Sequence, residues 1–199
     1  QLADNVFIVS PKINQSAKSK SITIKQNIYF KEMSKNFWIV EGTPTDCMIF
    51  ALNHLFNKNK PDLILSGINA GSNIGDEVSY SGTVAAAWEG AVRGIDSIAL
   101  SQYGGDDKIN SYECSQAKGF DIINYLLKIK SQTPRFYNVN FPFIISSNLE
   151  NVRSSFTTLA SQKIADEILF DDDFSSFMIG RMINDQSSLI NTDLECLNK

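Results

Sequence analysis

The sequence has few cysteines, no long apolar run and little positive charge, and each shortage limits what the protein can be. The three cysteines, Cys47, Cys114 and Cys196, are odd in number and lack C-x-x-C spacing. This argues against a disulfide framework or a cysteine metal site and indicates a reducing cytoplasm. No apolar run reaches the roughly 18 residues of a membrane span, so no membrane partner is expected. The net charge of −4 argues against a surface that coats nucleic acid.

The length of 199 residues with 43% apolar content fits one globular α/β domain, or one such domain with a small appendage. Short apolar runs alternate with helical patterns, which predicts a mostly parallel sheet with helices on both faces. The expected strands are residues 6–9, 21–25, 37–40, 62–66, 97–101 and 135–141, and the expected helices are residues 44–56, 83–93 and 112–130.

The character of the sequence changes in its last quarter. We expect an α/β core over residues 1–145 and a C-terminal β-hairpin extension over residues 146–199. Strands over residues 152–159 and 174–183 would be joined by the acidic Asp171, Asp172 and Asp173. Because no further spaced ligands accompany these aspartates, they favour a solvated turn over a metal site.

The stretch from Leu63 to Arg93 carries the strongest functional signal. A buried strand leads through a glycine-rich loop into a helix of small residues, and the glycines allow close approach of a ligand to the backbone. Ser81 is placed to cap this helix, so Ser81, Gly82 and Thr83 would present N–H groups and hydroxyls at the positive end of the helix dipole. This predicts a phosphate seat. The signatures G-x-G-x-x-G and G-x-x-x-x-G-K-[ST] are absent, and the alternative is a connection that only turns the chain.

A second helix start is predicted at Thr43, with Pro44 at the first helical position and Asp46 three residues after the cap. The only histidine, His54, falls in this helix and is interpreted as a surface residue. Ligands of parallel sheets bind beyond the carboxyl ends of the strands. We therefore expect the glycine-rich loop, the loop around Ser16 and the turn before Thr43 to meet there.

Four segments of the chain form a recognisable set: SPKINQSAKSKSIT, GTPTDC, SGINAGSNIGDEVSYSGTVAAAWEGA and NVNFP. In this order they resemble the SurE survival-protein family of 5′/3′-nucleotidases, and the resemblance covers nearly the whole chain. It implies a Rossmann-like α/β core with a protruding β-hairpin and, in the full-length family, a homodimer or homotetramer. It also implies removal of phosphate from nucleoside monophosphates with a divalent cation, Mg²⁺ or Mn²⁺.

The resemblance also assigns site residues. Ser16 in NQSAKS and Asn69 in SGINAG match the serine and asparagine metal ligands of the family. The positions that line the family's phosphate pocket are matched by Asn73, Ser81, Gly82 and Thr83. Hydroxyl and amide oxygens are hard donors of the kind that Mg²⁺ and Mn²⁺ accept.

The chain departs from the family at two places. The family begins with a strand that ends in Asn-Asp-Asp-Gly, whose paired aspartates are charged metal ligands, whereas this chain begins with Gln1 after that strand. No catalytic residue is therefore assigned, and an edge of the sheet should be exposed. Ala17 stands where the family has glycine, which could stiffen the Ser16 loop.

Two functions follow from these matches and departures. We expect a chain truncated at both ends that is either a metal-dependent phosphomonoesterase or an inactive remnant. Such a remnant would only bind nucleotides or anions, or would serve as a structural subunit. The sequence indicates no nucleotide preference.

Overall fold

The computed structural model describes residues 2–104, 112–144, 146–160, 168–171, 175–179 and 191–197. The chain forms two compact units. The first comprises Gln1–Asn73 and Ser79–Val152, and the second comprises Ile74–Val78 and Arg153–Lys199. The division predicted between residues 145 and 146 stays a prediction. None of the helices in the described ranges has the length and apolarity that crossing a bilayer requires.

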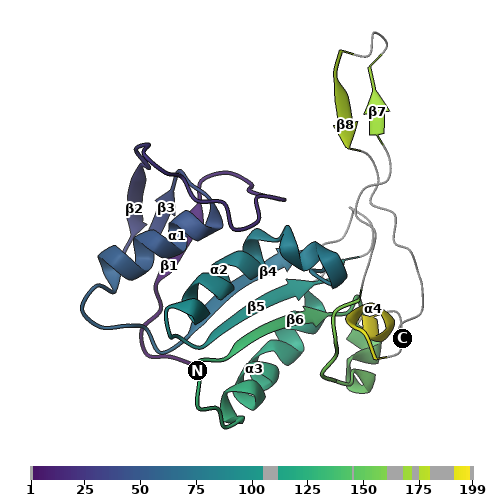
Figure 1. The fold of residues 1–199 in the computed structure, drawn as a ribbon. Coiled ribbons are helices and arrows are strands. Elements are labelled where there is room, and N and C mark those ends of the chain that lie inside the picture. The colour runs from purple at the N-terminus through teal and green to yellow at the C-terminus, as the bar shows by residue number, and fades with distance from the viewer. Residues whose placement is uncertain are drawn as a thin grey trace. The chain divides into compact units, whose positions relative to one another are not determined.

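A parallel sheet in the order β4-β5-β6 forms the centre of the first unit. Its strands are β4 (Ile64–Ala70), β5 (Ser97–Gln102) and β6 (Phe136–Phe141) (Figure 1). All residues of β5 are buried, as expected for the middle strand of a sheet that is covered on both faces. The predicted Rossmann-like α/β fold with a mostly parallel sheet is confirmed.

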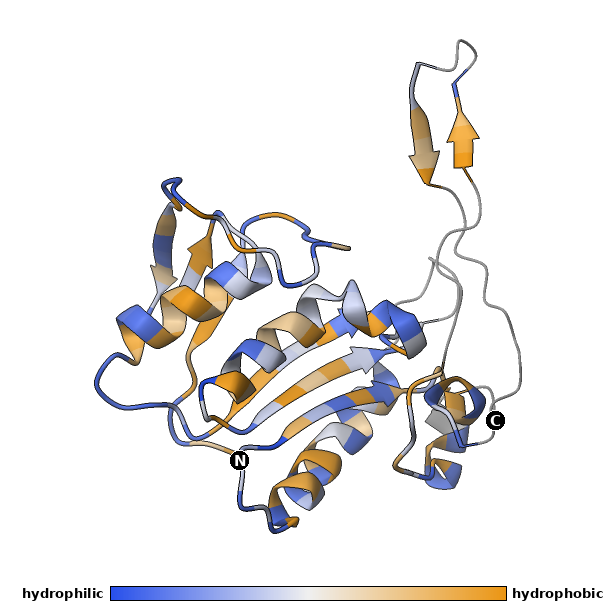
Figure 2. Ribbon diagram, viewed as in Figure 1, coloured by the Kyte–Doolittle hydropathy of each residue, from blue (hydrophilic) through white to orange (hydrophobic). Residues whose placement is uncertain are grey.

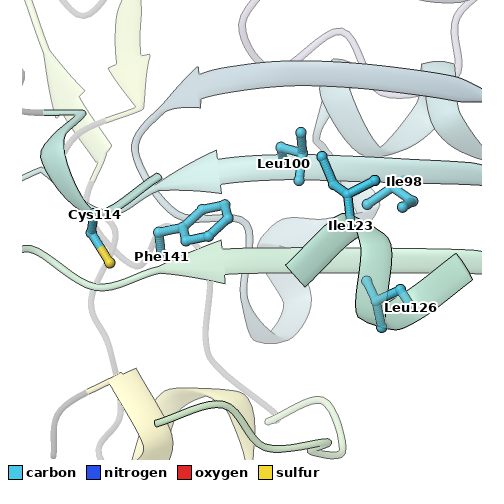
Figure 3. Packing of buried hydrophobic residues seen from close by; sticks show 6 residues of the cluster. All are labelled: Ile98, Leu100, Cys114, Ile123, Leu126 and Phe141. Carbon is cyan, nitrogen blue, oxygen red and sulfur yellow. The ribbon is translucent and has the colours of Figure 1, made fainter. Parts of the chain in front are cut away.

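Helices α2 (Gly82–Val92) and α3 (Glu113–Lys128) cover opposite faces of this sheet (Figure 1). The core cluster on the α3 side consists of Ile98, Leu100, Cys114, Ile123, Leu126 and Phe141 (Figure 3). On the other face, Ser97 lies against Gly90 of α2. The buried residues of α2 are mostly alanine and glycine, so this helix approaches the sheet closely.

A second, mixed sheet of the first unit has the order β1-β3-β2. β1 (Ile8–Pro11) is parallel to β3 (Phe37–Val40), and β2 (Phe30–Ser34) is antiparallel to β3. Helix α1 (Pro44–Phe50) continues as a π-helical turn over Ala51–Leu55 and packs on β1 and against α2.

Among the described residues, the edge strands of the two sheets of this unit are β1, β2, β4 and β6, and the edges of β1 and β4 carry half-exposed apolar side chains. Within the described ranges, β1 and β4 each pair with a neighbour along one side only. Ile8 of β1 is 52% exposed and Leu65 of β4 is 43% exposed. Unpaired edges with half-exposed apolar side chains are sites at which a further strand can add.

The strand predicted over residues 21–25 is wrong. Thr23 donates its backbone N–H and its hydroxyl to the carboxylate of Asp46, at 3.0 and 2.7 Å, so a side chain takes the place of a neighbouring strand. The antiparallel strand of this sheet is instead β2, which the sequence analysis did not predict. The first strand also lies slightly later than the predicted residues 6–9.

The second unit contains a β-hairpin and a short helix. β7 (Ile168–Phe170) pairs antiparallel with β8 (Phe177–Ile179), and α4 runs over Asp193–Leu197. A 3₁₀ turn over Gly75–Ser79 lies mostly in this unit, whereas the 3₁₀ turn over Ser146–Asn151 belongs to the first unit.

The strand predicted over residues 152–159 is wrong. Thr158 there makes only an isolated bridge to Thr192, because no described neighbouring strand continues the ladder. β8 falls within the predicted strand 174–183, of which residues 174 and 180–183 lie outside the described residues. Asp171 accepts hydrogen bonds from Ser175 and Ser176, as expected for a turn, while residues 172 and 173 lie outside the described residues.

Gly90→Ala should destabilise the chain, because a Cβ at position 90 would lie 2.3 Å from Cδ1 of Ile64 and 2.5 Å from Oγ of Ser97. Overpacking of this kind costs about 1–3 kcal/mol of the free energy of unfolding, which urea titration followed by circular dichroism measures.

Gly119→Ala in α3 is the matched control. Its Cβ would meet only Cζ of Phe141, at 4.0 Å. The control should therefore stabilise the chain, by up to about 1 kcal/mol, through helix propensity. Similar effects of the two substitutions would contradict the close approach of α2 to the sheet.

Candidate phosphate site

The predicted phosphate seat lies where α2 begins. Ser81 is the N-cap residue, and its Oγ accepts a hydrogen bond from the backbone N–H of Val84 at 3.1 Å, as predicted. In the part of the chain that the structure describes, the backbone N–H groups of Gly82 and Thr83 form no hydrogen bond with a protein acceptor. Such first-turn N–H groups, at the positive end of the helix dipole, favour an anion.

Asn69, near the end of β4, lies beside the start of α2. The hydroxyl of Thr83 donates to Oδ1 of Asn69 at 3.4 Å, and Nδ2 of Asn69 donates to the carbonyl oxygen of Gly71 at 2.9 Å. Gly71 has a φ angle of +109°, a backbone conformation that favours glycine. The structure thus brings together two predicted site residues, Asn69 and Thr83, at the carboxyl end of β4.

Ser16 lies in an exposed turn next to the start of α2. Its backbone N–H and its hydroxyl both donate to Oδ1 of Asn14, at 2.9 and 2.8 Å. A Cβ added to Gly82 would lie 2.7 Å from Cγ of Pro44 and 3.6 Å from the carbonyl oxygen of Gln15. This close approach accounts for glycine at position 82 and places the Ser16 turn beside the predicted seat.

Ala17 adopts a φ angle of +57°, in the left-handed region. For a residue with a Cβ this conformation costs roughly 1–2 kcal/mol. The backbone therefore gives a physical reason for the glycine that the resemblance places at this position.

Asn73 is buried and is held by two strands of the sheet. Its Nδ2 donates to Oγ of Ser101 at 2.6 Å, and its backbone N–H donates to Oδ1 of Asn140 at 2.7 Å. Its carbonyl oxygen accepts from Nδ2 of Asn138 at 2.7 Å and from Nδ2 of Asn140 at 3.1 Å. The side-chain amide of Asn140 thus binds the backbone of Asn73 as a neighbouring strand would. The role of Asn73 in lining a phosphate pocket stays a prediction.

Sequence reasoning missed Asn138 and Asn140. They lie two positions apart on β6 and therefore share one face of the sheet. The available signal was this pair of polar residues in a strand that begins and ends with phenylalanine. Oδ1 of Asn138 is buried and has no hydrogen-bond partner among the described residues.

The helix start predicted at Thr43 is confirmed as a capping box. The hydroxyl of Thr43 accepts from the N–H of Asp46 at 3.1 Å, and the Asp46 carboxylate accepts from the N–H of Thr43 at 2.9 Å. Asp46 is 3% exposed. Burial raises the pKa of its carboxyl, but the hydrogen bonds from Thr23 and Thr43 outweigh burial and hold this pKa below its usual value.

The donors that this site offers to a metal are neutral. Ser16 has a hydroxyl and Asn69 an amide oxygen, and no group of three or more His, Cys, Asp and Glu side chains in the described ranges could hold an ion. Mg²⁺ and similar cations usually bind proteins through one or two carboxylates. The two neutral oxygens alone therefore do not fit such a cation, and charged ligands would have to come from other residues.

Comparison with known proteins identifies the family. The sequence model of the family described as Survival protein SurE matches residues 1–166. The chain belongs to this family. The central segment of the SurE-family match contains the start of α2, with Ser81, Gly82 and Thr83.

Individual relatives agree with the family match. The protein named 5′-nucleotidase SurE from Azorhizobium caulinodans is 44% identical over 143 residues, which are 71% of this chain and 56% of the relative. The protein of the same name from Methylorubrum populi is 40% identical over 144 residues, which are 71% of this chain and 57% of the relative. The chain thus spans less than two thirds of the length of these relatives. The crystal structure of the SurE protein from Aquifex aeolicus matches with a TM-score of 0.78 at 28% identity, over 96% of this chain and 77% of that chain.

Asn140→Ala should lower the free energy of unfolding by about 1–3 kcal/mol, because it leaves the N–H of the buried Asn73 without its acceptor. Urea titration measures this cost. Asn138→Ala is the matched control, since it removes one of two donors to the same carbonyl oxygen and should cost less. If the control costs as much as Asn140→Ala, Asn140 is not the main support of the loop.

Proposed function

We propose that this chain carries the phosphate-binding part of a phosphomonoesterase that hydrolyses nucleoside 5′- and 3′-monophosphates to nucleoside and phosphate. One observation carries the proposal. The N–H groups of Gly82 and Thr83, which have no protein acceptor among the described residues, open the 11-residue helix α2 beside Asn69. Two relatives that carry the name 5′-nucleotidase SurE support the choice of substrate class.

In this proposal, the chain's own residues bind and orient the phosphate. The N–H groups of Gly82 and Thr83 donate to phosphate oxygens, and the dipole of α2 favours their negative charge. The Thr83 hydroxyl adds a donor, while Ser81 keeps the first turn ordered through its cap. Asn73 would line the same pocket from the loop that it fixes.

The proposed activity includes a divalent cation, Mg²⁺ or Mn²⁺. When bound, such an ion would stabilise negative charge on the phosphoryl group. Ser16 and Asn69 would be its neutral ligands, and one or two carboxylates would be required beside them.

A binding-only protein is the second candidate. The neutral oxygens of Ser16 and Asn69, which do not suffice for a metal, favour this candidate. An anion site at a helix start works without a metal. In that case, this chain would hold nucleotides or other anions, or act as a structural subunit, without turnover.

We expect the 199-residue chain to bind inorganic phosphate but to hydrolyse nucleoside monophosphates and p-nitrophenyl phosphate little or not at all, even with millimolar Mn²⁺. Phosphate should shift the backbone N–H signals of Gly82 and Thr83 in NMR spectra. Thr83→Val keeps the N–H but removes the hydroxyl, so the phosphate dissociation constant should rise about threefold.

Thr157→Val, at an exposed position of the second unit, is the control and should leave phosphate binding unchanged. Chelator-sensitive turnover by this chain would show that its own residues suffice for catalysis. In a longer polypeptide that supplies carboxylates, Ser16→Ala and Asn69→Ala should weaken the dependence of activity on the metal. The free energy of unfolding should change less than this dependence does. Hydrolysis by that longer protein would exclude the binding-only alternative.

We propose that the β7–β8 hairpin takes part in self-association, in a homodimer or homotetramer. Both strands are apolar (Figure 2), and their residues are between 45% and 69% exposed. These residues are Ile168, Leu169, Phe170, Phe177, Met178 and Ile179. A two-stranded hairpin is marginally stable alone, and apolar surface of this kind marks an interface.

The double substitution of Phe177→Ser and Met178→Ser should weaken self-association, because it removes apolar surface from both faces of the hairpin. Sedimentation velocity should show the dissociation constant rise by about tenfold or more. Phe120→Ser, which removes a 47% exposed ring from α3, is the control. Equal effects of the hairpin and control substitutions would place the interface elsewhere.

We propose that the chain works in a reducing cytoplasm, because its three cysteines lack the number and spacing of a disulfide framework. All three are free thiols, with Cys47 and Cys114 buried and Cys196 exposed. Burial, together with the nearby charge of Asp46, raises the pKa of Cys47 to about 12. Burial also raises the pKa of Cys114.

A further inference from the structure

The carboxylate of Asp46 accepts more hydrogen bonds than the capping box of α1 requires. Its Oδ1 accepts from the backbone N–H of Thr23 at 3.0 Å, and its Oδ2 accepts from the Thr23 hydroxyl at 2.7 Å and from the N–H of Thr43 at 2.9 Å. A capping box needs only the bond from Thr43. The two bonds from Thr23 come from a residue 23 positions earlier in the chain.

Residues 12–25, here called the strap, run from the end of β1 past the predicted phosphate seat. Ser19 donates its backbone N–H to the carbonyl oxygen of Tyr80 at 2.9 Å and its hydroxyl to that of Ser79 at 2.6 Å. The hydroxyl of Thr43 donates to the carbonyl oxygen of Ser21 at 2.7 Å. The strap therefore connects the start of α1 with the residues that immediately precede α2.

The surroundings of Asp46 are tightly packed. A Cβ added to Gly42 would lie 2.8 Å from Cβ and 2.8 Å from Oδ2 of Asp46. Three donors converge on the two oxygens of this buried side chain, so the charged form fits all of them. Asparagine has the same shape, but its NH2 group would face one of these N–H or O–H donors instead of accepting a hydrogen bond from it.

We propose that Asp46 is a positioning residue for the phosphate site: by anchoring Thr23, it holds the strap, whose Ser19 fixes the turn before α2 and whose Ser16 lies beside the start of that helix. The inference rests on the proposed function, because it concerns the same site. Asp46 does not contact the phosphate. It acts through Thr23 and, further along the strap, through the bonds of Ser19 to the turn before α2.

Thr23→Val removes the hydroxyl bond to Asp46 and keeps the backbone bond, whereas Thr23→Ser keeps both. Amide hydrogen exchange reports on the strap, and titration with inorganic phosphate, followed at the N–H signals of Gly82 and Thr83, reports on the site. In Thr23→Val, strap amides should exchange about tenfold faster, with α3 unchanged, and the phosphate dissociation constant should rise about three- to tenfold.

Thr23→Ser should behave as the parent chain does, and Asp46→Asn should reproduce both effects of Thr23→Val. Faster strap exchange with unchanged phosphate affinity would make the contact purely structural and would overturn the positioning role. Unchanged strap exchange in Thr23→Val would overturn it as well. If phosphate does not shift the Gly82 and Thr83 signals of the parent chain, the proposed function itself fails, and the positioning role falls with it.

Discussion

The close contact of α2 with β4 and β5 determines where the candidate site residues lie. Gly90 meets Ile64 and Ser97 with no room for a Cβ, so the helix axis lies near the sheet. Its first turn then starts at the carboxyl end of β4, where Thr83 reaches Asn69. A bulkier helix would stand farther from the sheet and would separate its first-turn N–H groups from the loop that follows β4.

Two segments that carry predicted site residues are held by different partners. Side-chain amides of β6 hold the backbone of Asn73. One buried carboxylate and three hydroxyls hold the strap. The contacts named here are hydrogen bonds, whereas apolar packing has little directional preference. Hydrogen bonds to polar side chains fix a loop in one position more strictly, because an unsatisfied buried partner is costly.

Features that depend on neighbours in the sequence could be predicted well. The caps at Thr43 and Ser81 involve partners only three residues away, and both were predicted. β3 has the predicted bounds, Phe37–Val40, because its apolar residues lie between clear turn signals. The resemblance to the SurE family added Ser16 and Asn69, which no spacing rule would have selected.

Features that depend on distant partners were missed. The alternating residues 21–25 have the pattern of a strand, but Asp46 satisfies Thr23, and the sequence does not show this pairing. Asn138 and Asn140 were likewise read as part of a strand and of the segment NVNFP, without a site role of their own. Their partner, Asn73, lies more than sixty positions away and reaches them only through the parallel arrangement of β4, β5 and β6.

The difference between the buried and the exposed cysteines makes this chain suitable for labelling. Thiol reagents attack the thiolate, and Cys47, with a pKa of about 12, is almost entirely protonated near neutral pH. Cys114 is buried and its pKa is also raised, whereas Cys196 is exposed. A maleimide fluorophore would therefore attach to Cys196, without any substitution in the chain.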